Sequence, residues 1–597
     1  MRETGRVERG GGSLGNPGGK PYHVVINAEN YHALKALDFC CAGKVDCIYI
    51  DPPYNTGARD WKYSNDYVDK SDSYRHSKWL AWMERRLKLA KKLLNPKTSV
   101  LIVTIDEKEY LRLGLLLEQM FPEARIQMLS VMINKNGQAR SQMFSRVDEY
   151  YFFVFMGESG ITRTTENMLF DTSDSTKTSR PTIWDSLIRR GTGSQRFESP
   201  KLFYPIFVDE NKQTIVKVGD PLGLDVDKET VVAPTGQAVV WPIHGDGSEG
   251  RWQVAPARLV EYLSKGWARL GHKNNRTGRW SVEYLKRKQI QQLKSGELVI
   301  NGYDEFGRPN IVPGETENAK LLDPKSLWVK GAHDASVYGT TLLASLLPQR
   351  RFPFPKSLYA VEDALRFVTA DNPDALIVDF FAGSGTTAHA VMRLNHQDGG
   401  HRVSISITNN EVSAQEERKL TKAGLRHGDA DWEKWGICRY VTEPRIRAAI
   451  TGTTPQGKPI KGDYRFADEF PMADGLDENA VFFDLTYEDP YQVELRRGFQ
   501  AIAPLLWMRA GCRGRIIRKE NDTYAIADTY AVLFHWSAVN AFIKRLEEQP
   551  EARTVYVVTD DPTQYTQLCG MLPDRDVIRL YRSYLESFKI ASEGGVD

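Results

Sequence analysis

The chain has 597 residues, which is too long for one compact core and indicates two to four domains. Apolar residues make up 41% and charged residues 26% of it, and no apolar run approaches the roughly 18–20 residues of a membrane span, so we expect a cytoplasmic globular protein. The six cysteines form no Cys-x-x-Cys pair, which argues against a zinc site or a disulfide framework, and the formal net charge of +2 by itself neither favours nor excludes a nucleic-acid partner.

The sequence pattern in the first part of the chain predicts a leader followed by an α/β segment. Residues 1–21 are rich in glycine and charge, and we expect them to be disordered. Between residues 22 and 159, short β-rich runs alternate with helical ones. We predict strands at 22–26, 46–50, 100–105 and 150–156, and helices at 31–37, 78–94 and 107–120. Such alternation predicts a mostly parallel sheet with helices on both faces.

The rhythm is lost from residue 160 to 350, where a separate irregular domain is expected. Its stretch from residue 251 to 294 carries eleven Lys and Arg against two Glu, with aromatic residues interleaved. Lys and Arg neutralise phosphates and flat rings contact bases, so this pattern favours DNA binding, although a solvated helix face with core aromatics would look the same. The candidate DNA-binding residues are Arg251, Trp252, Arg276, Arg279, Lys286, Arg287 and Lys288.

The α/β rhythm resumes in residues 351–460. We predict helices at 357–369 and 386–394 and strands at 375–380 and 403–408. Residues 461–597 read as a small accessory α/β domain, with strands at 530–534 and 554–559 and a helix at 538–548.

A four-residue motif, Asp51-Pro52-Pro53-Tyr54, directly follows the strand predicted at 46–50. Open α/β sheets bind ligands at the carboxyl ends of their strands. Consecutive prolines fix φ at about −65° and donate no N–H, so the Asp51 carboxylate and the Pro52 carbonyl become rigid, convergent acceptors. Two acceptors can take both hydrogens of an exocyclic amine and aim its lone pair at an electrophile, while Tyr54 stacks on an extruded base. The alternative is a proline-rich turn with an N-capping Asp.

A glycine-rich segment, residues 379–387, follows strand residues 376–378 and opens a helix. Glycines at such a turn let a ligand approach backbone N–H groups and the helix N-terminus. Residues 383–388 also fit the dinucleotide fingerprint G-x-G-x-x-A, which needs an acidic residue about 20 positions on to bind a ribose. Glu411 suits a dinucleotide and an adenosyl ribose equally well, but a dinucleotide site leaves the Asp-Pro-Pro-Tyr motif unexplained.

Together these strings resemble the modification (Mod) subunits of type III restriction–modification systems. The resemblance is carried by residues 48–57, 79–87, 379–387 and 398–400, and it covers about residues 22–450. The Asp-Pro-Pro-Tyr motif precedes the Phe-x-Gly-x-Gly loop, which is the order of the β group of amino-methyltransferases. This implies a circularly permuted Rossmann-like methyltransferase sheet that binds S-adenosylmethionine. The run from Asp463 onward departs from the common Mod tail.

The resemblance also assigns residues to roles. The catalytic residues would be Asp51, Pro52, Pro53 and Tyr54, on the target amine and base. Those that bind S-adenosylmethionine would be Asp379, Phe380, Phe381, Ala382, Gly383, Ser384, Gly385, Thr386, Glu411 at the ribose, and Lys356 in the string before the loop. Residues 22–159 and 351–460 would be the catalytic and cofactor-binding halves of the methyltransferase, and 160–350 the target recognition domain.

The implied activity is transfer of a methyl group to N6 of adenine in double-stranded DNA by base flipping, with no metal ion. Methylation of N4 of cytosine needs the same geometry and remains an alternative, although Asp at the first motif position favours adenine in the family. A chain that chiefly recognises DNA within a larger defence complex is a further alternative. The resemblance implies a bacterial, nucleoid-associated enzyme, a homodimer, and a restriction (helicase–nuclease) or other phage-defence partner.

Overall fold

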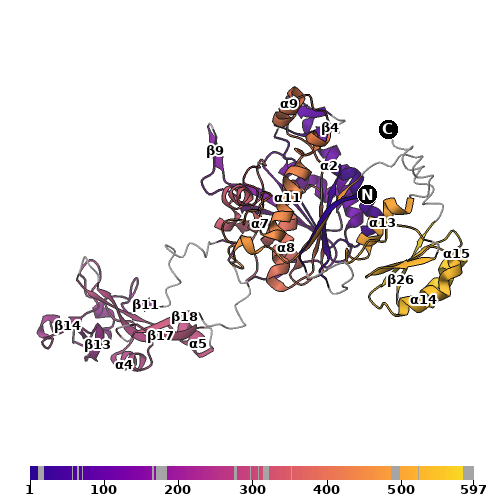
Figure 1. Ribbon diagram of the computed structural model, residues 1–597. Coiled ribbons are helices and arrows are strands. Elements are labelled where there is room, and N and C mark those ends of the chain that lie inside the picture. Colours follow the sequence, from indigo (N-terminus) through magenta and orange to yellow (C-terminus); the bar gives the residue numbers. More distant parts are fainter. Residues whose placement is uncertain are drawn as a thin grey trace. The chain divides into compact units, whose positions relative to one another are not determined.

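Two compact units make up the chain, Met1–Ser173 with Leu322–Asp597, and Asp174–Leu321 (Figure 1). The computed structural model describes residues 1–10, 19–56, 58–63, 66–69, 71–140, 142–164, 167–169, 184–273, 278–295, 298–304, 306, 308–313, 322–350, 352–485, 498–521 and 523–581. None of the helices in these ranges is both long and apolar enough to span a bilayer.

A ten-stranded mixed sheet is the frame of the first unit. In spatial order its strands are β1 (Arg2–Glu8), β22 (Asn479–Asp484), β2 (Tyr22–Asn27), β21 (Val403–Thr408), β20 (Leu376–Asp379), β3 (Cys47–Ile50), β6 (Val100–Ile105), β10 (Asp148–Phe155), β7 (Arg125–Met132) and β19 (Leu327–Trp328). The six strands from β22 to β6 run parallel to one another, whereas β10 is antiparallel to both of its neighbours. The predicted α/β, Rossmann-like sheet is confirmed.

Side chains of successive strand residues enter two different cores, one on each face of the sheet. Ile48 and Ile50 of β3 belong to one core, and Cys47 and Tyr49 to the other. This alternation is the period-2 geometry of a strand buried on both faces. The first face is covered by α1 (Asn30–Cys41), α2 (Arg75–Leu93) and α3 (Tyr110–Met120), and the second by α6 (Leu342–Leu346), α7 (Leu358–Thr369) and α8 (Thr386–Asp398). Smaller elements of this unit are the hairpins β4 (Ala58–Tyr63)–β5 (Asp66–Asp69) and β8 (Gln138–Arg140)–β9 (Met143–Arg146), with α9 (Ala414–Lys422), α10 (Ala430–Glu433) and α11 (Glu443–Thr451).

Three sequence-based boundaries differ from the structure. The expected disorder of residues 1–21 is wrong for β1, which pairs antiparallel with β22 at the edge of the sheet. Residues 479–484 were assigned by sequence to the accessory domain, but they form β22, because all six are buried and the strand pairs with β1 and β2. Residues 322–350 fall outside the second unit, since Trp328 of β19 is buried against the main sheet.

The second unit is built from short strands rather than being irregular. Its strands form two three-stranded sheets and one hairpin: β11 (Asp185–Ser186), β16 (Trp280–Tyr284) and β15 (Ala268–Lys273); β13 (Thr214–Val218), β12 (Ile206–Asp209) and β14 (Gln237–Val240); and β17 (Leu298–Tyr303) with β18 (Pro309–Pro313). Helices α4 (Pro256–Ser264) and α5 (Arg287–Ser295) complete it. One apolar core holds it together, with Tyr204, Trp252 and Leu259 near its centre.

A small α/β layer follows the main sheet along the chain, as predicted. It has the sheet β23 (Tyr524–Ile526), β24 (Tyr530–Leu533), β25 (Thr554–Val558) and β26 (Asp576–Leu580), with α13 (Gly498–Arg509), α14 (Val539–Glu547) and α15 (Pro562–Met571). Helices α14 and α15 share one core with β24 and β25. Residues of α13 enter the same core as α1, so this layer packs on the ten-stranded sheet.

Candidate active site

The two motifs meet at one edge of the sheet. Strands β3 and β20 are parallel neighbours with Val378 opposite Ile48, so the segments that follow them leave the sheet side by side. Helix α2 touches both segments: Trp79 Nε1 donates to the Pro53 carbonyl at 2.8 Å, and the Trp82 ring lies 5.3 Å from that of Phe381. Segments separated in the chain by the entire second unit thus form a single site.

Two hydrogen-bond donors orient the Asp51 carboxylate. Thr104 Oγ1, from the adjacent strand β6, donates to Asp51 Oδ1 at 2.6 Å, and Lys356 Nζ lies 3.1 Å from the same oxygen. The Asp51 side chain remains 28% exposed, so it stays open to a ligand. Within the described part of the chain, no hydrogen bond reaches the Pro52 carbonyl, whereas that of Pro53 is taken by Trp79. The two acceptors expected from the motif are therefore both available.

Lys356 lies beside the Asp-Pro-Pro-Tyr motif. The resemblance places it among the cofactor residues, but its ammonium contacts Asp51, the Tyr54 hydroxyl and, at 2.7 Å, Glu149 Oε2. Burial alone would lower the pKa of Lys356, but the charges of Asp51 and Glu149 raise it above its ordinary value, so the amine stays protonated. We therefore assign Lys356 to the Asp-Pro-Pro-Tyr motif.

Glu149 is the residue that sequence reasoning left without a role. It is 2% exposed and is the second residue of β10. Tyr54 donates its hydroxyl to Glu149 Oε2 at 3.0 Å. Burial, with the charges of Asp51 and Glu149, raises the pKa of Tyr54 well above its ordinary value, so the phenol keeps its proton and its orientation. Lys356 contacts this hydroxyl and so lies at the edge of the ring rather than over its face.

Positive φ angles shape the glycine-rich loop. Gly383 has φ +47° and Gly385, the residue before α8, has φ +78°, a region that other residues rarely occupy. A Cβ at Gly383 would lie 3.1 Å from the ring of Phe352. Thr442 Oγ1 donates to the Gly383 carbonyl at 2.6 Å and holds the bend from behind. The loop thus bends sharply just before the N-terminus of α8, which is the geometry of a backbone cradle for a ligand.

Asp379 is the acidic group of this loop. It is 4% exposed and accepts hydrogen bonds from the Phe381 N–H at 2.9 Å and from Thr387 Oγ1 at 2.6 Å. Burial raises the pKa of Asp379 to about 7, and the nearby charge of Asp51 adds to this, although the two hydrogen bonds oppose it. A cation bound beside Asp379 would favour its ionised form.

The side chains of other predicted cofactor residues are buried within the protein. Ser384 Oγ and Thr386 Oγ1 accept hydrogen bonds from Arg445 Nη1, at 3.0 and 2.7 Å, beneath the loop. Arg445 of α11 is fully buried, which lowers its pKa to about 10, and sequence gave it no signal because it lies on an ordinary helix about 60 positions away. The side chain of Phe380 is 1% exposed and belongs to the core.

The backbone positions the two remaining cofactor candidates. The Ala382 N–H donates to the Ile407 carbonyl at 3.1 Å, which ties the loop to the end of β21. Glu411 follows that same strand and is half-buried, with its carboxylate accepting from Asn409 Nδ2 at 3.2 Å. Since β21 neighbours β20, Glu411 stands at the same edge of the sheet as the glycine-rich loop.

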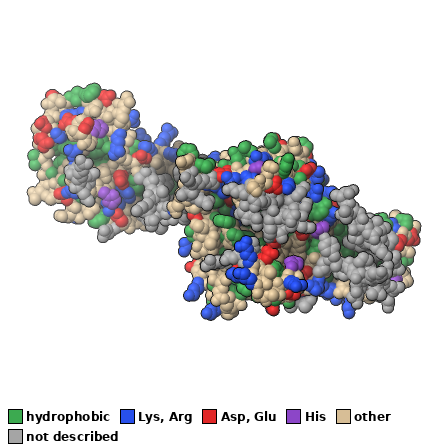
Figure 2. Space-filling model, turned by 90° about the horizontal axis from the view of Figure 1, so that it is seen from above, with side chains coloured by type: hydrophobic (Ala, Val, Ile, Leu, Met, Phe, Trp, Pro, Cys, Tyr) green, Lys and Arg blue, Asp and Glu red, His purple; other side chains and the backbone are tan. Residues whose placement is uncertain are grey.

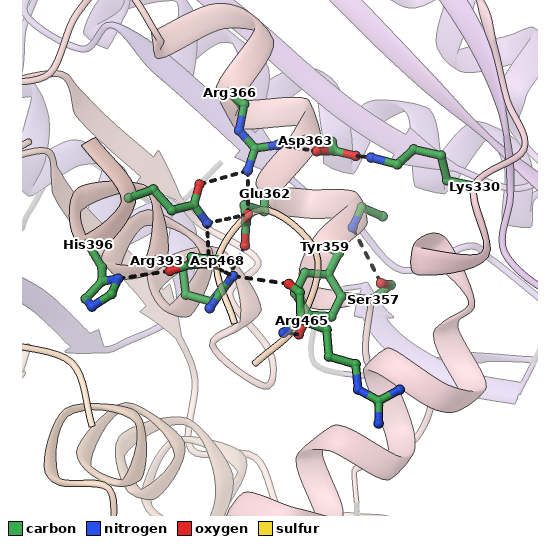
Figure 3. A network of polar contacts seen from close by, with 12 residues as sticks. Lys330, Ser357, Tyr359, Glu362, Asp363, Arg366, Arg393, His396, Arg465 and Asp468 are labelled. Atoms are coloured by element: carbon green, nitrogen blue, oxygen red, sulfur yellow. Dashed lines mark hydrogen bonds and ion pairs between the residues drawn. The ribbon is translucent and has the colours of Figure 1, made fainter. Parts of the chain in front are cut away.

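A buried ion network fixes the two halves of the site to each other (Figure 3). Helix α7 begins right after Lys356, with Ser357 as its N-cap, and α8 begins right after the glycine-rich loop. Glu362 of α7 accepts from Arg393 of α8 at 2.9 Å, and Arg393 also binds Asp468. Any rotation of α7 against α8 would break these contacts, so the network keeps Lys356 in register with the loop.

Asp363 anchors α7 at its other side. Lys330 Nζ lies 2.6 Å and His333 Nε2 2.9 Å from its Oδ2 (Figure 3 draws the lysine). Burial alone would raise the pKa of Asp363, but the hydrogen bond from His333 and the charges of Lys330 and Arg366 hold it well below its usual value. The carboxylate therefore stays ionised at neutral pH.

The predicted DNA-binding residues of the second unit differ in their exposure to solvent. Arg279, Arg287 and Lys288 are exposed, and Lys286, also exposed, pairs with Asp185 at 2.8 Å. Arg251 is half-buried and donates to the Gly193 carbonyl, while Arg276 lies outside the described residues. The prediction for Trp252 is wrong, because its ring is 2% exposed and its Nε1 donates to the Tyr204 carbonyl in the core. On the face shown in Figure 2, basic side chains lie interspersed with acidic and apolar ones.

Comparison with known families identifies the class to which this fold and site belong. A family model described as a DNA methylase, N6_N4_Mtase, matches residues 45–414, which is more than half of the chain and includes both motifs. The chain therefore belongs to this family of DNA methylases.

Three individual relatives share 25–28% sequence identity with the chain. The chain is 28% identical over 425 residues to the EcoPI Mod subunit, a type III restriction–modification enzyme of Escherichia phage P1, covering 65% of this chain and 58% of that one. It is 28% identical over 397 residues to the type II methyltransferase M.KpnI of Klebsiella pneumoniae, covering 65% and 80%, and 25% identical over 515 residues to the EcoP15I Mod subunit of Escherichia coli, covering 79% and 70%. Among solved structures, M1.HpyAVI with SAM aligns with a TM-score of 0.25 at 12% identity, over 67% of this chain and 100% of that one.

Proposed function

We propose that the chain transfers a methyl group from S-adenosylmethionine to N6 of adenine in double-stranded DNA. The observation that carries this proposal is the adjacency of the Asp-Pro-Pro-Tyr motif and the glycine-rich loop at the ends of β3 and β20. One segment supplies rigid acceptors for an amine, and the other supplies a cradle with a buried carboxylate for a cationic ligand. Membership in the DNA methylase family agrees with both halves.

The residues at the target side polarise an amine. Asp51 and the Pro52 carbonyl each accept a hydrogen bond from one N–H of the amine. These two bonds draw the nitrogen away from planar conjugation with the base and expose its lone pair. Thr104 and Lys356 hold the Asp51 carboxylate in place before the amine arrives, so little reorganisation accompanies the reaction. Tyr54, fixed by Glu149 and Lys356, stacks on the extruded base and sets the plane in which the amine lies.

The residues at the other side fit S-adenosylmethionine. Gly383 and Gly385 allow the positive φ angles that bend the loop before α8. Asp379 offers a counter-charge, and Glu411 offers an acceptor for ribose hydroxyls. When bound there, S-adenosylmethionine supplies a methyl group on a sulfonium, an already activated leaving group that needs no metal ion. Arg445 and Thr442 keep the loop in its bent form from below.

The second unit is the proposed target recognition domain. Its exposed Arg279, Arg287 and Lys288 suit contacts with phosphates. Because Mod subunits are among its relatives, we further propose that the chain works as a homodimer in the bacterial cytoplasm, with a restriction subunit as partner.

Long-read mapping of modified bases tests this function directly. DNA from cells that express the chain is expected to carry N6-methyladenine at every copy of one short sequence. DNA from cells that express the Asp51→Asn variant is expected to carry it at only a small fraction of these copies. N4-methylcytosine at the mapped sites would show that the target base is cytosine and not adenine. Unmodified DNA in both strains would refute the proposal.

Cofactor affinity is expected to rise with pH through about 7, the pKa of Asp379. Below that pH the carboxyl is largely neutral, and above it the carboxylate attracts the positively charged ligand, which itself lowers the pKa. Affinity should grow up to about tenfold for each pKa unit by which the ligand lowers it. Calorimetry at pH 6, 7 and 8 measures this. The Asp379→Asn variant should bind more weakly and lack this component of the pH dependence; an equal slope in both proteins would contradict the role of Asp379.

A further inference from the structure

A hairpin with an apolar tip stands out from the methyltransferase unit. Strands β8 and β9 are inserted between β7 and β10 and project from the body of the sheet (Figure 1). At its turn Met143 is 67% and Phe144 99% exposed. Phe144 is more exposed than any other large apolar side chain among the described residues. A large ring held wholly in water is costly, and two adjacent exposed apolar side chains at one tip favour a contact surface.

The base of this hairpin is fixed to the candidate active site. The Ile133 N–H donates to the Val147 carbonyl at 2.9 Å, which continues the pairing of β7 with β10. Arg146 of β9 reaches Asp106 at 3.4 Å and Glu149 at 4.0 Å. Glu149 in turn holds the Tyr54 hydroxyl. The hairpin and the ring proposed to stack on the target base therefore share one set of contacts.

The charge of the hairpin identifies the kind of partner. Residues 134–147 contain Lys135, Arg140 and Arg146 and no Asp or Glu. An apolar tip on a basic arm suits a ligand that is anionic outside and apolar inside, which describes a DNA duplex with its phosphates and stacked bases. Arg146 is already paired with Asp106 and Glu149, but a purely apolar partner would not explain Lys135 and Arg140.

We propose that Phe144 enters the base stack of DNA and occupies the space that the target base leaves when it is extruded. The proposal rests on the proposed function, and it adds a residue for base extrusion that lies outside both motifs. Extrusion costs unstacking and unpairing, and a ring inserted into the gap recovers part of that cost, so the extruded state becomes more populated. Met143, which is 67% exposed, adds a second apolar side chain at the same turn.

The test compares Phe144→Ala with wild type on two duplexes that contain the mapped recognition sequence. In one duplex the target adenine is paired, and in the other it faces an abasic position. Phe144→Ala is expected to lower kcat/KM about tenfold or more on the paired duplex and less than about twofold on the other, where unpairing costs little. With 2-aminopurine at the target position, the fluorescence rise on binding should fall in parallel. Phe144→Leu should retain part of both signals, and Leu115→Ala, another exposed apolar residue, should change neither.

Equal loss on both duplexes, or no loss on either, would overturn the proposal. A change in the dimer–monomer equilibrium by light scattering, with normal fluorescence on DNA, would also overturn it and assign Phe144 to a contact between copies of the chain. The failure of the proposed function is distinguishable, because wild type would then transfer no methyl group while the 2-aminopurine signal would still report extrusion.

Discussion

Replacing Asp51 by asparagine is expected to lower kcat for methyl transfer by about 10²–10³-fold, the usual loss for one preorganised electrostatic group. The amide keeps the size of the side chain but removes the charge that Thr104 and Lys356 hold in place, and it presents a donor where the amine needs an acceptor. Affinity for S-adenosylmethionine should stay within about twofold of wild type, because the loop after β20 is untouched. Single-turnover transfer of labelled methyl groups and calorimetry measure the two quantities.

Asp38→Asn serves as the matched control for this change. Asp38 lies on α1, 3.4 Å from Lys92 at the surface, and its loss should leave kcat unchanged. Wild-type turnover by Asp51→Asn would contradict the assigned chemistry, and a large loss of cofactor affinity would show that the two sides of the site do not act separately.

Replacing Lys356 by methionine is expected to affect both stability and turnover. The change leaves Glu149, whose side chain is 3% exposed, with only the more distant Arg146 as a cation at 4.0 Å. A buried charge that has lost its partner costs up to about 3–5 kcal/mol. Asp51 also loses a charge-assisted hydrogen bond of about 1.5–3 kcal/mol, which corresponds to about 10–10²-fold in kcat. Urea unfolding and methyl-transfer rates measure these effects.

The double variant Lys356→Met/Glu149→Gln separates the two roles of the lysine. Neutralising Glu149 removes the buried charge, so most of the stability should return, while kcat should stay low because Asp51 still lacks Lys356. Lys92→Met, which removes an exposed cation, is the control and should change neither quantity. Full recovery of kcat in the double variant would show that Lys356 only balances charge and does not orient Asp51.

Sequence predicted the sheet well where local pattern and burial agree. Strands β2, β6 and β21 and helices α7 and α8 lie within a few residues of their predicted bounds, because each has a strong apolar period between clear turn signals. The edges of the sheet were missed. Strand β1 is a charged run that is stable only because β22 pairs with it, and β22 comes from a distant part of the chain. Non-local pairing of this kind leaves no local pattern to detect.

Within the site, motifs predicted the loops but not what supports them. The positions of Asp51 and Gly383 follow from strand-end geometry, which a local string encodes. Lys356, Glu149, Thr104 and Arg445 act through contacts between separate elements, so only the folded chain brings them together. Trp252 shows the converse error: composition placed it in a basic, aromatic stretch, but its side chain fills a core.

Incubation of purified wild-type protein with DNA and methyl-deuterated S-adenosylmethionine, followed by mass analysis of the released nucleosides, tests the central claim most directly. Deuterated N6-methyladenine is expected in the wild-type sample, and about 10²–10³-fold less of it with Asp51→Asn at equal, early times. Absence of label from the DNA, or label on cytosine alone, would contradict it.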